Sequence, residues 1–547
     1  MVNIYEWRGV CYNKTINWKS VCSRRFVVDN GKETKRCQPL VEAMERYLQE
    51  GVYPLHTPGH KGGRGMAEPL RSLLGPSALR LDVSLMEELD DIHNPRGCLA
   101  AAQAAAAELY GSDAAFLAVN GTTGAIHAML MMALRPGDKV LVPRNSHRSV
   151  TGGLILSAAV PVFAAPPILD GTDLQGQLTP DQVEEAFRRY PDLRAVVLTS
   201  PNYYGMAADV AAIAAITHCH GAVLLVDEAH GPHLGFHEEL PPSALQCGAD
   251  VVAQSTHKIL GALTQCSLLH VRGPRVDRQR AADVVSLLTT TSPNYLLMGS
   301  LDAARAQLAA DGHGMMARAL AAARQLRRAL AGLPGLRVLA PSDVVGRAGI
   351  TALDETKVTL QLDRADTTGV ALGDALRRAG LAVELVDPRH VLFLVTYADA
   401  TDEWLGVCRR VRAVLEALPP WRGAPAGTVA PAPESGAGLR EDRLPAAALS
   451  ESAVPLRDVF YGQGETVPLS AAAGRVCGET VSFYPPGIPV LLPGERITAA
   501  ALAACRAQKA LGLPVSGPAD PTLATLRVLR ERRGGPSRHA GGPGAAI

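Results

Sequence analysis

The stretch AVLLVDEAHGPHLGFHEELPPSALQCGADVVAQSTHK, at Ala222–Lys258, decides the fold of this chain. It holds two apolar runs, AVLLV and ADVVA, and each run is followed at once by polar residues. Asp227 comes directly after the first run, and Lys258 stands about 30 residues later, which is the span of one strand–helix–strand unit. In parallel sheets the ligand site lies at the carboxyl ends of the strands. We therefore predict a parallel sheet with Asp227 and Lys258 at the same edge.

Asp227 and Lys258 carry opposite charges at this predicted edge. A lysine at the end of a buried strand is unfavourable unless it is paired or covalently modified. The arrangement fits pyridoxal phosphate, because the lysine forms a Schiff base and the carboxylate keeps the pyridine nitrogen protonated. An ordinary salt bridge explains the same spacing, so the spacing alone leaves both interpretations open.

Two further segments follow neighbouring apolar runs and favour the cofactor. Asn120–Gly124 (NGTTG) opens a predicted helix, and small hydroxyl residues at a helix N-terminus bind phosphate through backbone N–H groups. Pro143–His147 (PRNSH) brings an imidazole to the same edge, where the ring can stack on a flat cofactor. The alternative for His147 is a helix cap with an exposed ring.

The motif VDEAH at Val226–His230 also resembles the magnesium-binding motif of a helicase. That interpretation requires a phosphate-binding loop of the form GxxxxGK[ST] upstream. The Gly-Lys dipeptide of this sequence, Gly31-Lys32, is followed by Glu33. We therefore exclude the helicase class.

Outward from this stretch, short apolar runs alternate with Ala-rich helical segments, which is typical of βαβ units and an α/β fold. The first helix is expected at Leu40–Gln49, ended by Gly51. After Asp302, long helices lead into four strand-like runs, GLRVLA, KVTLQLD, LAVELVD and HVLFLVT. We expect an N-terminal extension of unknown role at 1–37, a cofactor-binding major domain at 38–310, a small α+β domain at 311–418, a Pro/Gly/Ala-rich linker at 419–455, a C-terminal α+β domain at 456–530 and a disordered tail at 531–547.

The composition argues against several classes of protein. The chain has 547 residues, of which 47% are hydrophobic and 20% charged, and this suits two or three globular domains. Lys and Arg number 54 against 53 Asp and Glu, and aromatic residues make up 4%. This balance argues against a nucleic-acid partner and a basic membrane-binding surface. No apolar run approaches the length of about 18 residues that a membrane span needs.

The N-terminal region and the cysteines bear on the location of the protein. The first residues, MVNIYEWRGVCYNKTINW, lack the apolar run of a secretory signal, and none of the ten cysteines stands in a CxxC pair. Cys11, Cys22 and Cys37 cluster near the start, where zinc ligation is an alternative although their spacings match no common zinc motif. We predict free thiols, a cytoplasmic location and no metal site.

Taken together, the motifs resemble the Orn/Lys/Arg decarboxylase family, the bacterial basic-amino-acid decarboxylases with an aspartate-aminotransferase-like fold. The segments that carry the resemblance run in family order along most of the chain. They are HTPGHKGGRG at 56–65, DDIHNPRG at 90–97, FLAVNGTTG at 116–124, PRNSHRSV at 143–150, SPNYYG at 200–205, VDEAHG at 226–231, STHKILGALTQ at 255–265, TSPNYLLM at 291–298 and YPPGIPVLLPGE at 484–495.

The sequence departs from the family pattern in three places. Cys266 follows the lysine segment where the family usually has a small Ser, Thr or Ala, and we expect no consequence. The first 37 residues or so resemble nothing in the family. The N-terminal wing domain of the large inducible members is missing, so their decameric assembly need not apply.

The resemblance implies a PLP-dependent transferase of fold type I. Its parts would be a mainly parallel seven-stranded-type sheet flanked by helices, a small α+β domain and a C-terminal α+β domain. Lys258 would form the Schiff base with pyridoxal 5'-phosphate, and Asp227 would pair with the pyridine nitrogen. Either Lys258 or His257 would return the proton to the substrate. The remaining cofactor contacts implied are His147 and Ala229 on the two ring faces, His230 near the phenolic edge, and Thr122, Thr123, Ser255 and His257 around the phosphate.

The same resemblance implies decarboxylation of a basic L-amino acid in polyamine metabolism. Arginine, giving agmatine, is favoured over lysine, giving cadaverine, and over ornithine. A homodimer or larger homo-oligomer with sites at the subunit interface is expected, and TSPNYLLM at 291–298 either reaches the partner's phosphate or packs in the core. For the basic end of the substrate we favour Glu495 over Asp82 and Asp90; the alternative for Glu495 is a helix cap, since a predicted helix follows.

Two other classes share parts of this pattern. An aminotransferase of the same fold would keep Lys258 and Asp227, but it would normally need an arginine clamp and a second amino acceptor. The C-terminal domain and the STHK segment argue against it. A non-catalytic binding protein of the family would be expected to lose Lys258 or Asp227, and both are present.

Overall fold

The computed structural model describes residues 37–364, 366–419, 449–483 and 488–530. Most of the predicted N-terminal extension, including Cys11 and Cys22, lies outside the described residues, as do most of the predicted linker and all of the tail at 531–547. The described cysteines are free thiols except Cys37, which is disulfide-bonded. The prediction of free thiols is therefore wrong for Cys37, because sequence spacing alone does not reveal which sulfur atoms meet in the fold.

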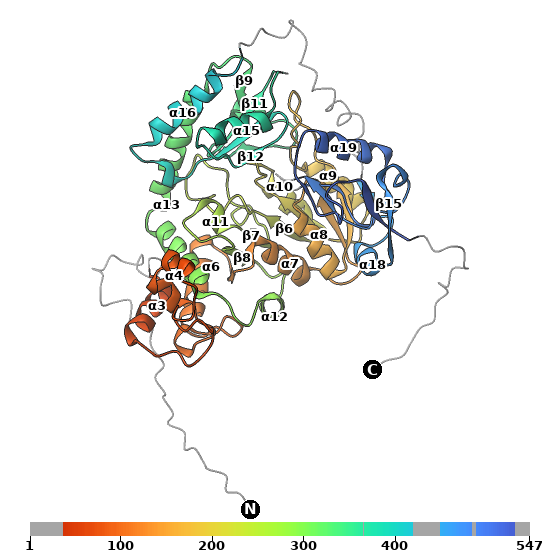
Figure 1. The fold of residues 1–547 in the computed structure, drawn as a ribbon. Coiled ribbons are helices and arrows are strands. Elements are labelled where there is room, and N and C mark those ends of the chain that lie inside the picture. The colour runs from red at the N-terminus through yellow and green to blue at the C-terminus, as the bar shows by residue number, and fades with distance from the viewer. Residues whose placement is uncertain (1–36, 365, 420–448, 484–487, 531–547) are drawn as a thin grey trace, which may run out of the picture.

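A mixed eight-stranded sheet forms the centre of the molecule (Figure 1), and it confirms the α/β fold class. Five neighbouring strands are parallel; the others pair antiparallel at the two sides. Across the sheet the strands are β1 (Ala114–Ala118), β8 (Ser267–Val271), β7 (Val251–Gln254), β6 (Val223–Asp227), β4 (Leu193–Thr199), β2 (Lys139–Pro143), β3 (Val160–Ala164) and β14 (Leu449–Glu451). The first seven match the expected number, and β14 joins the edge from far along the chain.

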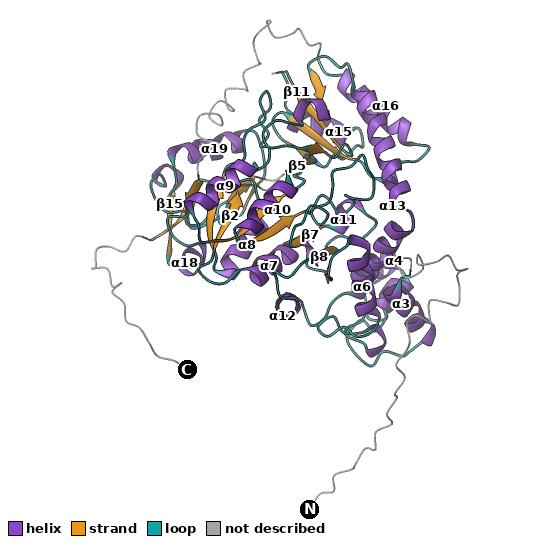
Figure 2. Cartoon of the chain, turned by 180° about the vertical axis from the view of Figure 1, so that it is seen from behind, coloured by secondary structure: helices purple, strands orange, loops and turns teal. Residues whose placement is uncertain are grey.

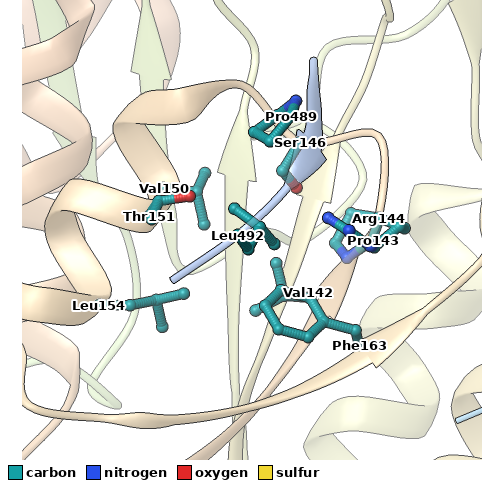
Figure 3. Close-up of a pocket in the computed structure, with 10 residues that line it drawn as sticks. All are labelled: Val142, Pro143, Arg144, Ser146, Val150, Thr151, Leu154, Phe163, Pro489 and Leu492. Carbon is teal, nitrogen blue, oxygen red and sulfur yellow. The ribbon is translucent and has the colours of Figure 1, made fainter. Parts of the chain in front are cut away.

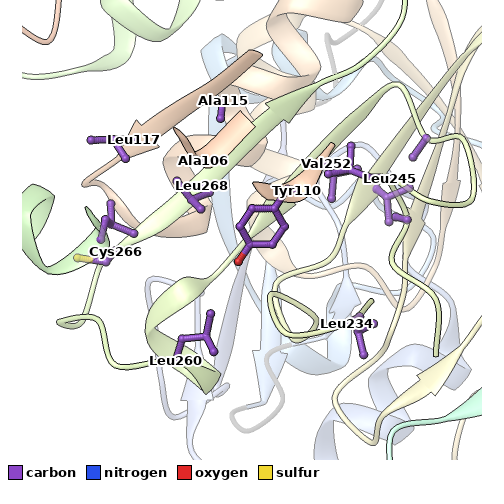
Figure 4. Packing of buried hydrophobic residues seen from close by; sticks show 14 of the residues in the cluster. Ala106, Tyr110, Ala115, Leu117, Leu234, Leu245, Val252, Leu260, Cys266 and Leu268 are labelled. Atoms are coloured by element: carbon purple, nitrogen blue, oxygen red, sulfur yellow. The ribbon is translucent and has the colours of Figure 1, made fainter. Parts of the chain in front are cut away.

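Alternate side chains of the strands enter two separate cores, because successive residues of a strand point to opposite faces. In β6, Val223 and Leu225 belong to one core, whereas Leu224 and Val226 belong to the other. Figure 4 shows part of the second of these cores around Tyr110. The first core is covered by α7 (Gly121–Ala133), α8 (Arg148–Ser157) and α12 (Arg278–Leu288), and the second by α6 (Cys98–Tyr110), α9 (Pro180–Arg189), α10 (Val210–Cys219) and the start of α13 (Tyr295–Leu330).

The N-terminal elements pack beside α6 and α13. The helix expected at Leu40–Gln49 is confirmed as α3 (Pro39–Glu50), and Gly51 ends it in the left-handed conformation that favours glycine. The next elements are α4 (Glu68–Leu74), α5 (Pro76–Leu81) and the 3-10 turn η2 (Glu87–Leu89). Helix α4 has no buried side chain, so its apolar residues face outward.

A second, four-stranded antiparallel sheet carries its own core (Figure 2). The four strand-like runs expected after Asp302 are all present in it. In sheet order they are β12 (Leu385–Val386), β13 (His390–Leu394), β11 (Lys357–Leu362) and β9 (Leu336–Val338). The end of α13, which kinks at Asp311, packs here with α15 (Gly369–Arg378) and α16 (Trp404–Glu416). Short elements nearby are α14 (Pro341–Val344), η3 (Tyr397–Asp399) and the pair β5 (Met206–Ala207) and β10 (Ala352–Leu353).

The C-terminal part forms a further small α+β unit. Its strands are β15 (Gly464–Pro468) with β19 (Thr525–Leu529), and β17 (Pro489–Leu491), β16 (Val481–Phe483) and β18 (Val515–Ser516). Its helices are α18 (Leu456–Tyr461), η4 (Leu469–Ala471) and α19 (Ala499–Ala510). Leu456 and Leu492 enter the core beneath α7 and α8, so this unit is packed onto the main sheet. None of the described helices has the length and apolar character to cross a membrane.

Candidate active site

Polar side chains meet at the carboxyl edge of the central sheet, where the sequence predicts them. Asp227 ends β6, and Lys258 lies on the short helix α11 (Thr256–Ile259) directly after β7. Lys258 Nζ lies 2.8 Å from His230 Nε2 and 5.4 Å from the centre of the Tyr203 ring. Tyr203 also packs on His230, with ring centres 4.5 Å apart. The lysine is thus held in an aromatic corner of the site.

The charges of this edge act on Lys258 through a largely buried environment. Burial lowers the pKa of Lys258, whereas the carboxylates of Asp227 and Glu384 raise it. Burial raises the pKa of Asp227, and the charge of Lys258 and the Ala229 N–H group lower it. Ala229 N donates to Asp227 Oδ1 at 3.1 Å. Among the described residues no ion pair joins Asp227 to Lys258, so the geometry does not realise the salt-bridge alternative.

Three hydroxyl groups meet at the N-terminus of α7, at the same edge. Thr122 Oγ1 lies 2.7 Å from Ser267 Oγ and closer still to Ser255 Oγ. Asn120 is the N-cap residue of α7 but makes no side-chain cap bond, and Thr123 is exposed in the first turn. An anion at this turn would therefore find helix N–H groups without a side-chain acceptor.

His147 is the N-cap residue of α8. Its Nδ1 accepts from Ser149 N at 3.2 Å, so the predicted alternative of a helix cap is realised, although the ring is half-buried rather than exposed. Burial, with the nearby charge of Lys258 adding to it, lowers the pKa of His147 to about 4. A neutral His147 ring close enough to interact with the charge of Lys258 is compatible both with capping α8 and with stacking on a cofactor.

His257 is fixed by the loop that follows α11. Its Nδ1 lies 2.8 Å from the Cys266 carbonyl oxygen, which favours the tautomer that donates from Nδ1. Burial lowers the pKa of His257. The Nε2 atom of the ring is therefore the one left for a proton-transfer role.

Several polar atoms of the edge have no partner within the described part of the chain. These buried atoms are Thr199 Oγ1, His230 Nδ1 and Thr256 Oγ1. Buried polar atoms usually have a partner, from the protein or from a bound molecule. Together with the uncapped α7 N-terminus, the buried carboxylate and the lysine, these atoms fit a flat, polar ring that carries a phosphate.

Glu495 lies on the C-terminal unit rather than at this edge. Its Oε2 accepts from Arg144 Nη2 at 2.8 Å and from Leu492 N at 3.0 Å. The following helix α19 is capped by Thr498, so the helix-cap alternative for Glu495 is wrong. The contact between the C-terminal unit and the main sheet around Glu495 is called the seam here. A cavity at this seam, lined by Arg144 and Leu492 among others, has a volume of about 10 Å³ (Figure 3). That is room for about one water molecule, not for an amino acid.

The weaker candidates for the substrate's basic end also have local partners. Asp82 lies 3.1 Å from His60 Nε2 and accepts from Asn294 Nδ2 at 3.2 Å. Asp90 accepts backbone N–H groups around the start of α6, the shortest from Gly97 N at 2.7 Å. A substrate contact for either group stays a prediction.

The segment TSPNYLLM divides into two parts. Thr291 and Ser292 are exposed, as a contact with a partner subunit would require. Tyr295 is fully buried, and its hydroxyl donates to Asp90 O at 2.6 Å. The second half of the segment therefore packs in the core.

Sequence reasoning assigned no role to Tyr203, Ser267 and Glu384. Tyr203 stands in the quoted segment SPNYYG directly after β4, so its place after a strand was a usable signal. Ser267 begins an antiparallel strand that was not predicted, and Glu384 comes from the second sheet region. Neither position carries a local signal that points to the site.

One group of possible metal ligands occurs among the described residues. His237, Glu238 and His313 bring ligand atoms within 4.8 Å of one another at the surface. The two histidine rings are stacked, with their planes 22° apart. Parallel rings do not direct their in-plane nitrogen lone pairs at one point, so the prediction of no metal site stays as it is.

Comparison with known proteins gives concordant matches. Residues 38–403 match the family model described as "Orn/Lys/Arg decarboxylase, major domain", and residues 442–510 match "Orn/Lys/Arg decarboxylase, C-terminal domain". The chain is 38% identical to an arginine decarboxylase of Halalkalibacterium halodurans and 36% identical to one of Bacillus subtilis. Each alignment covers 90% of this chain and 98% of the relative.

A solved structure shares the fold. The lysine decarboxylase LdcF of Francisella novicida superposes with a TM-score of 0.75 at 21% sequence identity. The superposition covers 91% of this chain and 82% of that one.

Proposed function

The chain belongs to the Orn/Lys/Arg decarboxylase family, and we propose that it decarboxylates arginine to agmatine with pyridoxal phosphate as cofactor. The observation that carries the proposal is the position of Lys258 Nζ, 2.8 Å from His230 Nε2, at the edge that also holds Asp227. Lysine and ornithine are the alternative substrates. Arginine is favoured because the two relatives of 36% and 38% identity bear that activity in their names.

Each residue of the edge has a role in this proposal. Pyridoxal phosphate, when bound, supplies an electron sink for the bond that loses carbon dioxide. Lys258 would hold the cofactor covalently, and Asp227 would provide the negative charge that keeps the ring nitrogen protonated. Thr122, Ser255 and the first N–H groups of α7 would hold the phosphate. The last of these roles agrees with the missing side-chain cap of α7.

Residues around the ring would exclude water and move protons. His147 and Ala229 would cover the two ring faces, and His230 would lie near the phenolic edge. Because burial lowers its pKa, the Lys258 amine is easier to deprotonate and can transfer a proton at the substrate Cα. His257 is the second candidate, since its Nδ1 is fixed by Cys266 O and its Nε2 remains for the transfer.

The basic end of the substrate requires an acidic partner. We keep Glu495 as the first candidate, although its carboxylate is shared with Arg144. Glu384 is a second candidate, because it is exposed and its charge acts on Lys258. A guanidinium makes planar two-point contacts with a carboxylate, which favours arginine over lysine at such a site.

A homodimer is part of the proposal. Exposed apolar side chains gather in the N-terminal region, and α4 has no buried residue at all. Such groups usually mark an interaction surface. They are Val52, Tyr53, Leu55, Leu70, Leu73, Leu74 and Leu85. The exposed residues Thr291 and Ser292 agree with a site completed by a second copy. Sedimentation analysis of Leu55→Asp/Leu73→Asp should give monomers where the wild-type protein gives dimers.

A role in polyamine synthesis and a cytoplasmic location complete the proposal. Agmatine production would feed polyamine synthesis, and the free thiols of seven of the eight described cysteines, all but the disulfide-bonded Cys37, support a cytoplasmic location.

The proposal is tested by supplying arginine, lysine and ornithine separately to the purified protein with pyridoxal phosphate. Agmatine and one equivalent of carbon dioxide from arginine are expected. A keto acid in place of an amine would support the aminotransferase alternative. The absence of any product from all three substrates would support a non-catalytic member.

A further inference from the structure

A buried lysine that takes no part in the proposed chemistry contacts the turn that carries His230. Lys357 begins β11, and its Nζ donates to Asp354 Oδ2 at 2.8 Å. His233 Nε2 lies 3.1 Å from the same carboxylate oxygen. The side chains of Lys357, Asp354 and His233 are all 0% exposed. The other oxygen of Asp354 accepts from the backbone and the hydroxyl of Thr356.

This buried cluster is not explained by stability alone, because the free energy needed to take two ions out of water is about as large as the free energy that their pairing returns. A well-packed apolar cluster would stabilise this position as well or better. Buried ion pairs are retained in some proteins because they fix one particular arrangement. The contacts of Lys357 indicate which arrangement is fixed here.

Lys357 joins the second sheet to the turn that carries His230. Its Nζ also donates to the His230 carbonyl oxygen at 3.4 Å, and the His230 ring touches Lys258. The segment SPNYYG contacts the same pair through Gly205, whose carbonyl oxygen accepts from Asp354 N at 2.8 Å. A Cβ atom at Gly205, whose φ is +82°, would lie 2.8 Å from Asp354 O and 2.9 Å from Lys357 Cγ. Both loops that place aromatic groups around Lys258 therefore rest on this pair.

The charge of Lys357 also acts on the site. Burial, followed by the charges of Lys258 and Lys357, lowers the pKa of His230 well below its ordinary value. Lys357 likewise lowers the pKa of Lys258, in addition to burial and against the carboxylates of Asp227 and Glu384. Besides these groups, His147, the N-cap residue of α8, and His257 on α11 interact electrostatically with Lys258.

We propose that Lys357, held by Asp354 and His233, is a positioning residue that fixes His230 against the catalytic Lys258. The inference rests on the proposed function only for the role of Lys258, since the contacts themselves are independent of substrate. The second sheet thereby contributes to the site, because Lys357 at the start of β11 holds the turn that follows β6.

The test removes the charge of Lys357, the charge of Asp354, or both. Each variant is measured with bound cofactor and without substrate. Lys357→Met removes a positive charge near Lys258, so the pH midpoint of the visible absorbance should rise by about half a unit or more. Asp354→Asn removes a negative charge, so the midpoint should fall. If the pair had a purely structural role, the pH midpoint would shift in the same direction in both variants or would not shift in either. That result would overturn the inference.

The double variant Lys357→Met/Asp354→Asn covers the case in which a single variant fails to fold, because it leaves no unpaired ion. Its amide hydrogen exchange across residues 228–234 should be at least tenfold faster than in wild type, and its kcat should fall at least tenfold with KM within threefold. Unchanged exchange would overturn the inference. Lys139→Met, which breaks the partly exposed pair with Asp192 at the start of β2, is the matched control and should change none of these values.

The two proposals fail in different ways. If the wild-type protein forms no amine from any basic amino acid while exchange in the double variant rises, the proposed function fails and the positioning role stands. If the wild-type protein is active and neither absorbance nor exchange responds, the positioning role fails alone.

Discussion

The carboxyl edge of the central sheet and the seam around Glu495 were both assigned chemistry from the sequence, yet the structure treats them differently. At the sheet edge, Lys258 reaches His230 and feels the charge of Asp227. At the seam, Glu495 is already paired with Arg144, next to a cavity of about 10 Å³. Chain topology forces strand-end residues together, whereas the partner of a loop carboxylate depends on packing that a motif does not contain.

The largest effect is expected at the edge. Lys258→Ala should abolish turnover and the visible absorbance of bound cofactor, because Lys258 is the residue that the proposal bonds to the cofactor. Circular dichroism should remain that of the wild type. Lys139→Ala, at the opposite end of the sheet, should retain full activity. Normal decarboxylation by the Lys258 variant would show that the sheet edge is not the catalytic site.

The next effect concerns Asp227. Asp227→Asn keeps the shape but removes the charge that holds the ring nitrogen protonated, so kcat should fall by several orders of magnitude. Cofactor affinity, measured by absorbance titration, should fall much less. A rate within tenfold of wild type would exclude Asp227 as the partner of the ring nitrogen.

The seam gives a smaller and more discriminating effect. If Glu495 contacts arginine, Glu495→Gln should lower kcat/KM at least thirtyfold, since removing one member of a buried charged pair costs about 2–5 kcal/mol. Glu384→Gln is the companion variant. A loss confined to Glu384→Gln would move the substrate contact to the second sheet region and leave Glu495 as the structural partner of Arg144. The absorbance of bound cofactor should be unchanged in both variants.

The smallest effect is on stability. The pKa of His147 is lowered to about 4, so the unfolded chain binds a proton between pH 6.5 and 4 that the folded chain does not. Stability should therefore fall as the pH drops through this window, by at most about 3 kcal/mol for this group and by less to the extent that solvent screens the half-buried ring. Urea denaturation of His147→Asn, which retains a capping side chain, should show a shallower pH dependence. His313→Asn, at an exposed position, should keep the wild-type slope.

The sequence predicted the parts of the fold that repeat a local pattern. The alternation of strands and helices, the helix α3 and the α/β class are confirmed. The strands β3, β8 and β14 were not predicted: VPVFA contains Pro161, SLLHV follows the preceding strand without the long helix of a βαβ unit, and β14 follows a Pro/Gly/Ala-rich stretch.

The site shows the same limit. Lys258, Asp227 and Thr122 stand next to strand ends or a helix start, so their meeting follows from topology. The buried pair of Lys357 and Asp354 could not be predicted, because Lys357 begins an apolar strand of the second sheet and meets the His230 turn only in the folded chain.

The central claim is that Lys258 at the sheet edge holds the cofactor. The direct test is reduction of the cofactor-loaded protein with borohydride, followed by proteolysis and mass spectrometry of the labelled peptide. The account predicts a single label on Lys258, in a peptide that contains STHK. A label on another lysine, such as Lys357, or no label on any peptide, would contradict it.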